Sequence, residues 1–250
     1  MKTLSLIFFC CMTTNMAFAK PVEIQLKKQK MSTEQMFQLC KLLANDCLET
    51  TNWQWFKTQQ NYYLIDQLKL YQFSGNIDNT LKIQKQWDFS AYQAKTQQPR
   101  WSEMSDEPSP LTIFPKLFPV NEHDYAVALV QRWNESYSGG GMHEEVADFV
   151  QLLPNGKYQQ IFQNIPLSMY RMIRACFSEE DYKKAGEQCH DEYALATEIA
   201  YVKPRTWNVK YHYQSWISKV SDSNEKNIDE RKNYVLNQNL ADAIQLPKRW

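Results

Sequence analysis

The sequence predicts an α+β protein that is mainly antiparallel β-sheet, built from meanders and hairpins, with helices near the N- and C-termini. Three observations lead to this fold class. Short stretches in the second half alternate apolar and polar residues with a period of two, which is typical of half-buried strands. Tight-turn residues separate these stretches, and successive strands joined by tight turns pair antiparallel. Near each end of the chain, apolar residues follow helical spacing instead.

The first nineteen residues have the order of a secretory signal peptide. Met1 and Lys2 give a positive start, residues 4–12 form an apolar run, and Ala17-Phe18-Ala19 is a small-x-small cleavage site. The apolar run is too short to cross a bilayer core of ~30 Å, which needs roughly 20 residues. We expect cleavage near Ala19, no membrane span, and a periplasmic or secreted single globular domain over residues 20–250. A buried N-terminal helix is the alternative.

The mature chain would begin with a basic segment, residues 20–31, that is either an edge strand or a loose lead-in. Ser32 is a candidate helix N-cap, and Gln35 three residues later completes a capping box. Apolar residues at helical spacing then predict a helix over residues 33–45. These residues are Met36, Leu39, Cys40, Leu42 and Leu43.

An aromatic, β-prone stretch extends from residue 51 to residue 89. Ser74-Gly75-Asn76 interrupts it with a turn signal, so we expect a hairpin. Residues 91–110 are polar and contain three prolines. They predict a long loop or a subdomain boundary.

Alternation is clearest in the second half, where five strands are expected. They cover residues 125–137, 146–153, 158–165, 193–202 and 207–217. Pro154-Asn155-Gly156 separates the second strand from the third, because Asn-Gly tolerates the positive φ of a tight turn. Residues 221–233 are charged and are expected to face solvent. A last amphipathic helix is expected from the spacing of Leu236, Leu240, Ala243 and Ile244.

Four cysteines remain after cleavage and predict two disulfides, because an even count is typical of exported proteins. They are Cys40, Cys47, Cys176 and Cys189. Cys176 and Cys189 bracket a short polar stretch and are expected to pair. On one continuous helix Cys40 and Cys47 would be about 10 Å apart in rise, beyond the ~7 Å that a disulfide tolerates. We favour a helix break near Asn45 and a Cys40–Cys47 bridge; both bonding elsewhere, or a four-cysteine zinc site, are the alternatives.

The most unusual segment lies between the first two of the five strands and holds three of the six glycines. Its candidate contact residues are Ser138, Gly139, Gly140, Gly141, Met142 and His143. Glycine allows close backbone approach, and loops on rigid sheets often bind ligands. The segment is therefore either a flexible hairpin loop or a binding loop, and its glycine spacing matches neither a dinucleotide motif nor a P-loop. Residues 138–141 resemble the Ser/Gly loop of bacterial periplasmic lysozyme inhibitors, and no function is carried over from these four residues.

Three clusters combine histidine with carboxylates: residues 122–124, 143–145 and 190–192. Such groups can bind a metal or act as acid and base. A strand of about fourteen residues at ~3.3 Å each would separate His123 from His143 by roughly 45 Å, so we expect no shared site. Cys189 beside His190 is expected to be oxidised rather than nucleophilic. We predict no catalytic, metal or cofactor site.

The charge balance argues against a nucleic-acid partner. Without residues 1–19 the chain has 27 basic and 28 acidic residues, a net charge of about −1, whereas nucleic-acid binding usually needs a clustered positive excess. We expect an exported, soluble, non-enzymatic binding or inhibitor/immunity-type protein whose partner is a protein or small ligand of the cell envelope. The alternatives are a secreted hydrolase that uses Glu and His residues, and a structural component of the envelope.

Overall fold

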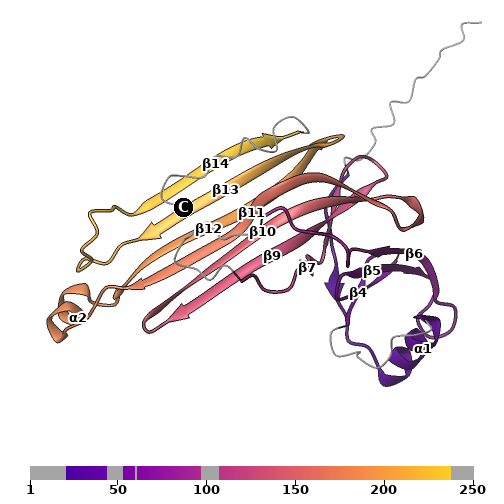
Figure 1. Ribbon diagram of the computed structural model, residues 1–250, viewed down its shortest axis with the longest axis horizontal. Coiled ribbons are helices and arrows are strands. Elements are labelled where there is room, and N and C mark those ends of the chain that lie inside the picture. The colour runs from indigo at the N-terminus through magenta and orange to yellow at the C-terminus, as the bar shows by residue number, and fades with distance from the viewer. Residues whose placement is uncertain (1–20, 44–52, 60, 97–106, 238–250) are drawn as a thin grey trace, which may run out of the picture.

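The computed structural model describes residues 21–43, 53–59, 61–96 and 107–237. In this part of the chain the structure is mostly antiparallel strand, with two short α-helices, and it contains two sheets. Figure 1 shows a long sheet of extended hairpins and, at one end of it, a small sheet with α1 (Thr33–Leu43) on its outer side. The predicted dominance of antiparallel sheet is confirmed.

The large sheet has nine strands in the order β1-β8-β9-β10-β11-β12-β13-β14, and β7 also pairs with β9. From β9 onward each strand pairs with the next along the chain, so the sheet is a long meander. Its strands are β1 (Ile24–Gln25), β7 (Thr112–Ile113), β8 (Lys116–Pro119), β9 (Tyr125–Tyr137), β10 (Gly140–Leu152), β11 (Tyr158–Arg174), β12 (His190–Lys203), β13 (Thr206–Trp216) and β14 (Ile228–Leu236).

The small sheet has five strands in sequence order. They are β2 (Lys27–Lys28), β3 (Gln54–Lys57), β4 (Tyr62–Asp66), β5 (Lys69–Ser74) and β6 (Lys82–Asp88). Leu39 of α1 is fully buried against Trp55, Leu64 and Phe73, which lie on the outer face of the sheet. Because β1 belongs to one sheet and β2 to the other, the segment from residue 24 to residue 28 joins the two layers.

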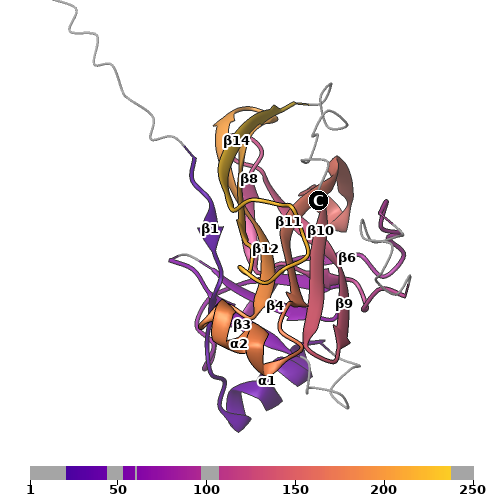
Figure 2. The same ribbon diagram turned by 90° about the vertical axis from the view of Figure 1, so that its left-hand side faces the viewer.

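A shared core fills the space between the two sheets. Phe56, Ile65 and Leu70 of the small sheet pack against Val127 and Leu129 of β9. The opposite face of β9 is also buried, in a second cluster to which the distant strands β12, β13 and β14 contribute. Figure 2 shows the reason, because the large sheet is twisted and curled so that its far strands turn back toward the near ones.

The expectation that residues 125–137 form a half-buried strand is therefore wrong for the first half of β9. Residues 126–131 are all buried, because the small sheet covers one face and the curled sheet covers the other. The second half, from Arg132 onward, is partly open to solvent apart from buried Trp133. Alternating composition identified the strand but not the second layer that packs on it.

The helix predicted over residues 33–45 is confirmed as α1, and Ser32 and Gln35 exchange both hydrogen bonds of the capping box. The basic segment before it contains the edge strands β1 and β2. The stretch before Gly75 contains three strands rather than one arm of a hairpin. The expected turns at Gly75 and at Asn155-Gly156 both have positive φ.

Two elements of the second half were not predicted. β14 occupies part of the charged segment that was expected to face solvent, and it forms the far edge of the large sheet with most of its residues exposed or half-buried. Charged side chains protect an edge strand from pairing with other chains, which explains this composition. A further helix, α2 (Glu179–Ala185), begins at a capping box formed by Ser178 and Asp181.

The expected C-terminal helix is not seen at its first residue, since Leu236 is the last residue of β14. Its other residues, the expected signal peptide and residues 97–106 of the expected loop lie outside the described residues. Within the described chain no helix is both long enough and apolar enough to cross a membrane.

Candidate ligand-binding cleft

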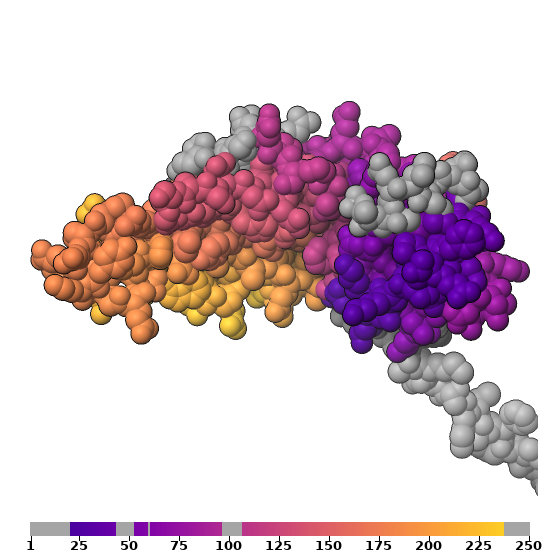
Figure 3. All heavy atoms as spheres, turned by 90° about the horizontal axis from the view of Figure 1, so that it is seen from below, coloured from indigo at the N-terminus to yellow at the C-terminus, as the bar shows by residue number. Residues whose placement is uncertain are grey.

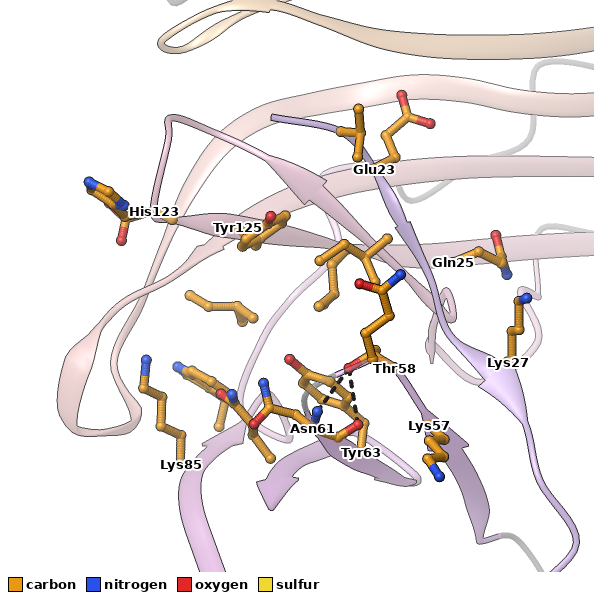
Figure 4. Close-up of a pocket in the computed structure, with 18 of the residues that line it drawn as sticks. Glu23, Gln25, Lys27, Lys57, Thr58, Asn61, Tyr63, Lys85, His123 and Tyr125 are labelled. Carbon is orange, nitrogen blue, oxygen red and sulfur yellow. Dashed lines mark hydrogen bonds between the residues drawn. The ribbon is translucent and has the colours of Figure 1, made fainter. Parts of the chain in front are cut away.

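A cleft of about 850 Å³ opens where the two sheets diverge. Its walls come from the joining segment at residues 22–29, from strands β3 to β6 of the small sheet, and from the β8–β9 connection of the large sheet. Figure 4 shows these side chains arranged around an open space. A concave site between two layers is a common place for a small ligand to bind.

The cleft arises because one row of side chains continues past the end of the shared core. Tyr63, Gln72 and Lys85 are paired across β4, β5 and β6, so they share the inner face of the small sheet. Exposure rises along this row, from buried Tyr63 through half-buried Gln72 to exposed Lys85. The row therefore forms a wall that runs from the core to solvent.

The floor of the cleft is buried and largely apolar. Tyr63, Trp87 and Leu117 are each nearly fully buried there. The Trp87 Nε1 donates a hydrogen bond of 2.9 Å to the carbonyl of Leu153, which ties the small sheet to the large one. Burial, with the neighbouring phenol of Tyr125, raises the pKa of Tyr63 to about 12, so its hydroxyl stays protonated at neutral pH.

Side-chain amides and a structured turn make up much of the rim. Thr58 and Asn61 close the turn between β3 and β4, where the Thr58 hydroxyl donates to the Asn61 carbonyl and accepts from the Asn61 amide, both at 3.0 Å. Each amide side chain offers both a donor and an acceptor. The amides that line the cleft are Gln25, Gln29, Gln59, Asn61 and Gln72.

The charged groups of the cleft are unequally paired. Glu23 forms an ion pair of 2.5 Å with Lys116. The carboxylate of Asp124 accepts hydrogen bonds from Asn121 at 2.8 Å and Gln151 at 3.2 Å. In contrast, the three lysines of the lining form no ion pair within the described residues. They are Lys27, Lys57 and Lys85.

The glycine-rich segment proposed from the sequence lies at the far end of the large sheet, and most of it is strand rather than loop. The turn between β9 and β10 contains only Ser138 and Gly139. Gly139 has φ of +87°, and a Cβ there would come within 2.7 Å of Arg174 Cδ. Gly140 lies in β10, where a Cβ would come within 2.3 Å of the Met172 carbonyl. These glycines permit close strand packing, which the sequence cannot distinguish from loop flexibility.

The six candidate contact residues do not share one surface. Met142 is buried in the core of the large sheet, whereas His143 points to the opposite, partly exposed face. The structure thus leaves Ser138 and Gly139 at the hairpin tip and separates them from the other four. Whether the tip binds a partner stays a prediction.

His143 lies in a polar cluster on the outer face of β9, β10 and β11. Its Nδ1 is 2.7 Å from Asn134 Oδ1, and its Nε2 is 3.4 Å from Ser168 Oγ. Ser168 donates instead to Glu145 at 2.9 Å, and Arg132 holds the same carboxylate. Because the serine proton is directed to Glu145 and not to the imidazole, this arrangement does not activate a nucleophile.

Ionisation in this cluster follows from burial and charge. Burial lowers the pKa of His143, although Glu145 opposes that shift. Burial works to raise the pKa of Glu145, but hydrogen bonds from Arg132 and Ser168, together with the charges of Arg132 and His143, lower it overall. His143 is opposite Asn134 in the β9–β10 register, and His123 lies eleven residues before Asn134 in the chain. The expected separation of the two histidines is therefore confirmed. His123 lines the cleft instead.

The expected Cys176–Cys189 bridge is confirmed, with Cα atoms 5.2 Å apart. Cys189 is thus no free thiol beside His190. Cys40 is also disulfide-bonded, whereas Cys47 lies outside the described residues, so that pairing stays a prediction. Among the described residues, no three histidine, cysteine or acidic side chains gather as a metal site would require.

The cleft was missed at the sequence level because its walls come from segments far apart in the chain. The one available signal was the basic character of residues 20–31, six of which line the cleft. A scan against protein-family models, a search of curated proteins and a search of solved structures each found no match to this chain.

Proposed function

We propose that this is an exported, non-enzymatic binding protein that holds its ligand in the cleft between the two sheets. The observation that carries the proposal is the cleft itself, a space of about 850 Å³ with a buried, largely apolar floor and a polar rim. Ligand sites of proteins are usually concave and preformed, with a few polar groups that fix orientation. Both sheets contribute walls, so the packing of the shared core holds the site open.

Binding is favoured over catalysis by the state of the groups that line the cleft. Glu23 is neutralised by Lys116, and Asp124 is occupied by two amides. A general base needs an available carboxylate or imidazole within reach of a reacting group. His123 is exposed at the rim, and in the described lining no carboxylate forms a hydrogen bond to it. A hydrolase would need these groups to converge, and they do not.

Export is part of the proposal and rests on two features. The first nineteen residues have the order of a secretory signal. The Cys176–Cys189 disulfide is of the kind that persists in an oxidising compartment. Together they support a periplasmic or secreted location for residues 20–250.

A cleft-filling substitution tests the proposal. Gln72→Trp adds a bulky ring at the middle of the cleft wall, and Gln159→Trp is the matched control, since Gln159 is exposed on β11 and does not line the cleft. The chain from Lys20 onward would be screened against glycan, peptide and metabolite arrays. We expect ligands bound by the wild type to be lost with Gln72→Trp and kept with Gln159→Trp. Equal binding by all three proteins would contradict a ligand in the cleft.

A second candidate is protein binding through the far tip, as the inhibitor/immunity-type expectation suggests. Phe177 is 73% exposed and Tyr182 is 49% exposed, although both are aromatic. Arg174 organises them: its Nη2 donates to the Tyr182 hydroxyl at 3.2 Å, and its guanidinium lies 5.3 Å from the Phe177 ring. Exposed aromatics on a braced scaffold are typical of protein contacts. In Figure 3 this tip and the small sheet occupy opposite ends of the molecule.

The tip hypothesis has its own test. Phe177→Ser removes the aromatic side chain that is most exposed among the described residues, without touching the core. Proline at Gly139 would instead disrupt the turn, because φ there is +87°. A pull-down with wild type and Phe177→Ser would show whether capture of one protein depends on the tip. Capture that is insensitive to Phe177→Ser would exclude this surface.

A further inference from the structure

We propose that the outward face of strands β11 to β14 binds a second copy of this chain, sheet against sheet, about a two-fold axis. These strands lie side by side in the large sheet (Figure 1). None of them lines the cleft, so this is a second binding surface, independent of the proposed ligand site. Exposed apolar side chains, a self-complementary shape and matching charges carry the inference.

Large apolar side chains are exposed on this face. In β12 and β13 alternate residues are buried, and most of the residues between them point outward to solvent. By the strand register, the same face includes Tyr170 of β11, Trp216 of β13 and Val235 of β14. These side chains are 38%, 40% and 52% exposed, respectively. Apolar side chains that gather on one exposed face, rather than lie scattered, mark a surface that contacts a partner.

The shape of the face is self-complementary because one strand presents short side chains and its neighbour presents long ones. Three outward positions of β12 hold alanine, and their partners on β13 hold longer polar residues. These pairs are Ala194–Gln214, Ala196–His212 and Ala200–Asn208. A two-fold axis between β12 and β13, parallel to the strands, places β12 of one copy on β13 of the other. Long side chains then meet short ones, which suits two sheets packed about 10 Å apart.

The charges of the two strands match across the same axis. Glu198 of β12 and Lys210 of β13 are register partners in the middle of the face, and both are exposed. Rotation about the axis brings Glu198 of one copy over Lys210 of the other, and symmetry repeats the contact. A two-fold interface needs this self-complementarity, because the same patch faces itself. A second copy is therefore favoured over an unrelated protein.

The size of the face suits a weak dimer. Four strands at ~4.8 Å spacing, with about ten residues each at ~3.3 Å, cover roughly 600 Å². Two copies would then bury about 1,200 Å² in total, which is at the lower end of the range for specific interfaces. We therefore expect a reversible dimer whose population rises with protein concentration.

Sedimentation equilibrium of the chain from Lys20 onward, between ~1 µM and ~1 mM, tests self-association. We expect the apparent mass to rise from that of one chain toward that of two. Ala196→Arg puts a long charged side chain where β13 of the second copy would lie, so it should raise the dimer dissociation constant at least about tenfold. Gln84→Arg is the matched control, because Gln84 is exposed on β6 of the small sheet, and it should dimerise as the wild type does.

Charge reversal tests the two-fold arrangement. Glu198→Lys and Lys210→Glu should each weaken the dimer about tenfold, because each creates like-charge contacts at both symmetry-related positions. The double variant Glu198→Lys/Lys210→Glu restores opposite charges across the axis. Its dissociation constant should return to within about threefold of the wild-type value.

Thermal unfolding should show every variant folded, because the substituted side chains are exposed. A wild type that stays monomeric up to ~1 mM overturns the inference. A dimer that Ala196→Arg does not weaken also overturns it, since the contact then lies elsewhere. If the double charge reversal fails to restore the dimer, the pairing of β12 with β13 of the second copy is wrong. None of these outcomes bears on a ligand in the cleft, which Gln72→Trp tests separately.

Discussion

The two ends of the large sheet use the same strands in different ways. At the near end a second sheet packs on β9 and β10, so both faces are buried and a cleft forms where that second layer stops. At the far end the strands extend beyond the second layer, and a disulfide and α2 brace the tip instead. The position of the small sheet, and not the long meander, therefore decides where the cleft forms.

The largest difference in stability is expected between a substitution in the shared core and one at the far tip. Phe56 is 2% exposed between the two sheets, and Phe177 is on the surface of the far tip. Phe56→Ala should lower the free energy of unfolding by about 3–5 kcal/mol, because it removes a buried ring and leaves a cavity. Phe177→Ala should change it by no more than about 0.5 kcal/mol. Urea denaturation of both variants measures the difference. Equal losses of unfolding free energy would contradict a core between the two sheets and a solvent-exposed tip.

Removal of the Cys176–Cys189 disulfide at the far end should have the next largest effect on stability. Cys176 and Cys189 close a loop with a sequence separation of 13. Replacing both with serine should cost about 3 kcal/mol in the chain-entropy account. Hydrogen exchange should then increase around α2 while exchange in β4 and β5 stays unchanged. Uniform loosening of both ends would mean that the tip and the small sheet are not independent.

Alanine substitutions at two glycines of the far end distinguish the cost of backbone strain from the cost of side-chain packing. Gly139 and Gly186 both have positive φ, but only Gly139 has atoms near its missing Cβ. Each substitution by alanine should cost about 1 kcal/mol from strain at φ above zero. Gly139→Ala should cost more than Gly186→Ala, since Arg174 must also move. Thermal unfolding of the two variants compares them directly, and a larger loss at Gly186 would contradict the packing of Arg174 on the turn.

The facing lysines of β2 and β3 should have a small effect of opposite sign. Lys57→Gln removes repulsion from Lys27, so in low salt it should raise the free energy of unfolding by about 0.2–1 kcal/mol. The gain should shrink in high salt, because screening already weakens the repulsion. Chemical denaturation at two salt concentrations provides the measurement. A loss of stability in low salt would show that Lys57 has a stabilising partner.

The smallest expected effect is on pH dependence at the far end. Burial lowers the pKa of His143 below 6.5, so between its folded value and 6.5 the unfolded chain binds the proton more readily. Stability should therefore fall as pH drops through this window, and His143→Gln should remove that part of the slope. Glu145, with its own lowered pKa, contributes stability that is lost only below about 4.5, at more acidic pH. An unchanged slope in the variant would exclude His143 as its source.

Sequence patterns predicted those parts of the fold in which one face of an element is buried and the other is solvated. β13 follows the expected alternation, and α1 begins at its expected capping box. β4 was not separated from its neighbours, because Tyr63, Leu64 and Ile65 are all buried and leave no alternation to detect. α2 was missed although Ser178 and Asp181 form a capping box, since the helix is only seven residues long.

The candidate site was harder to predict than the fold. Lys27, Gln72 and His123 are ordinary polar residues in three distant segments, and only the folded arrangement brings them to one cleft. The glycines at 139–141 were conspicuous in the sequence, yet they mainly serve close packing of a hairpin. A conspicuous local composition therefore pointed to the tip, whereas the cavity depends on how two layers meet.

The most direct test of a ligand held between the two sheets is hydrogen exchange of the chain from Lys20 onward, with and without a saturating ligand taken from the array screen. We expect slower exchange in residues 22–29, 61–63 and 82–88, which border the cleft, and no change in residues 174–190 at the far tip. Protection confined to the far tip, or no protection anywhere, would contradict a ligand held between the two sheets.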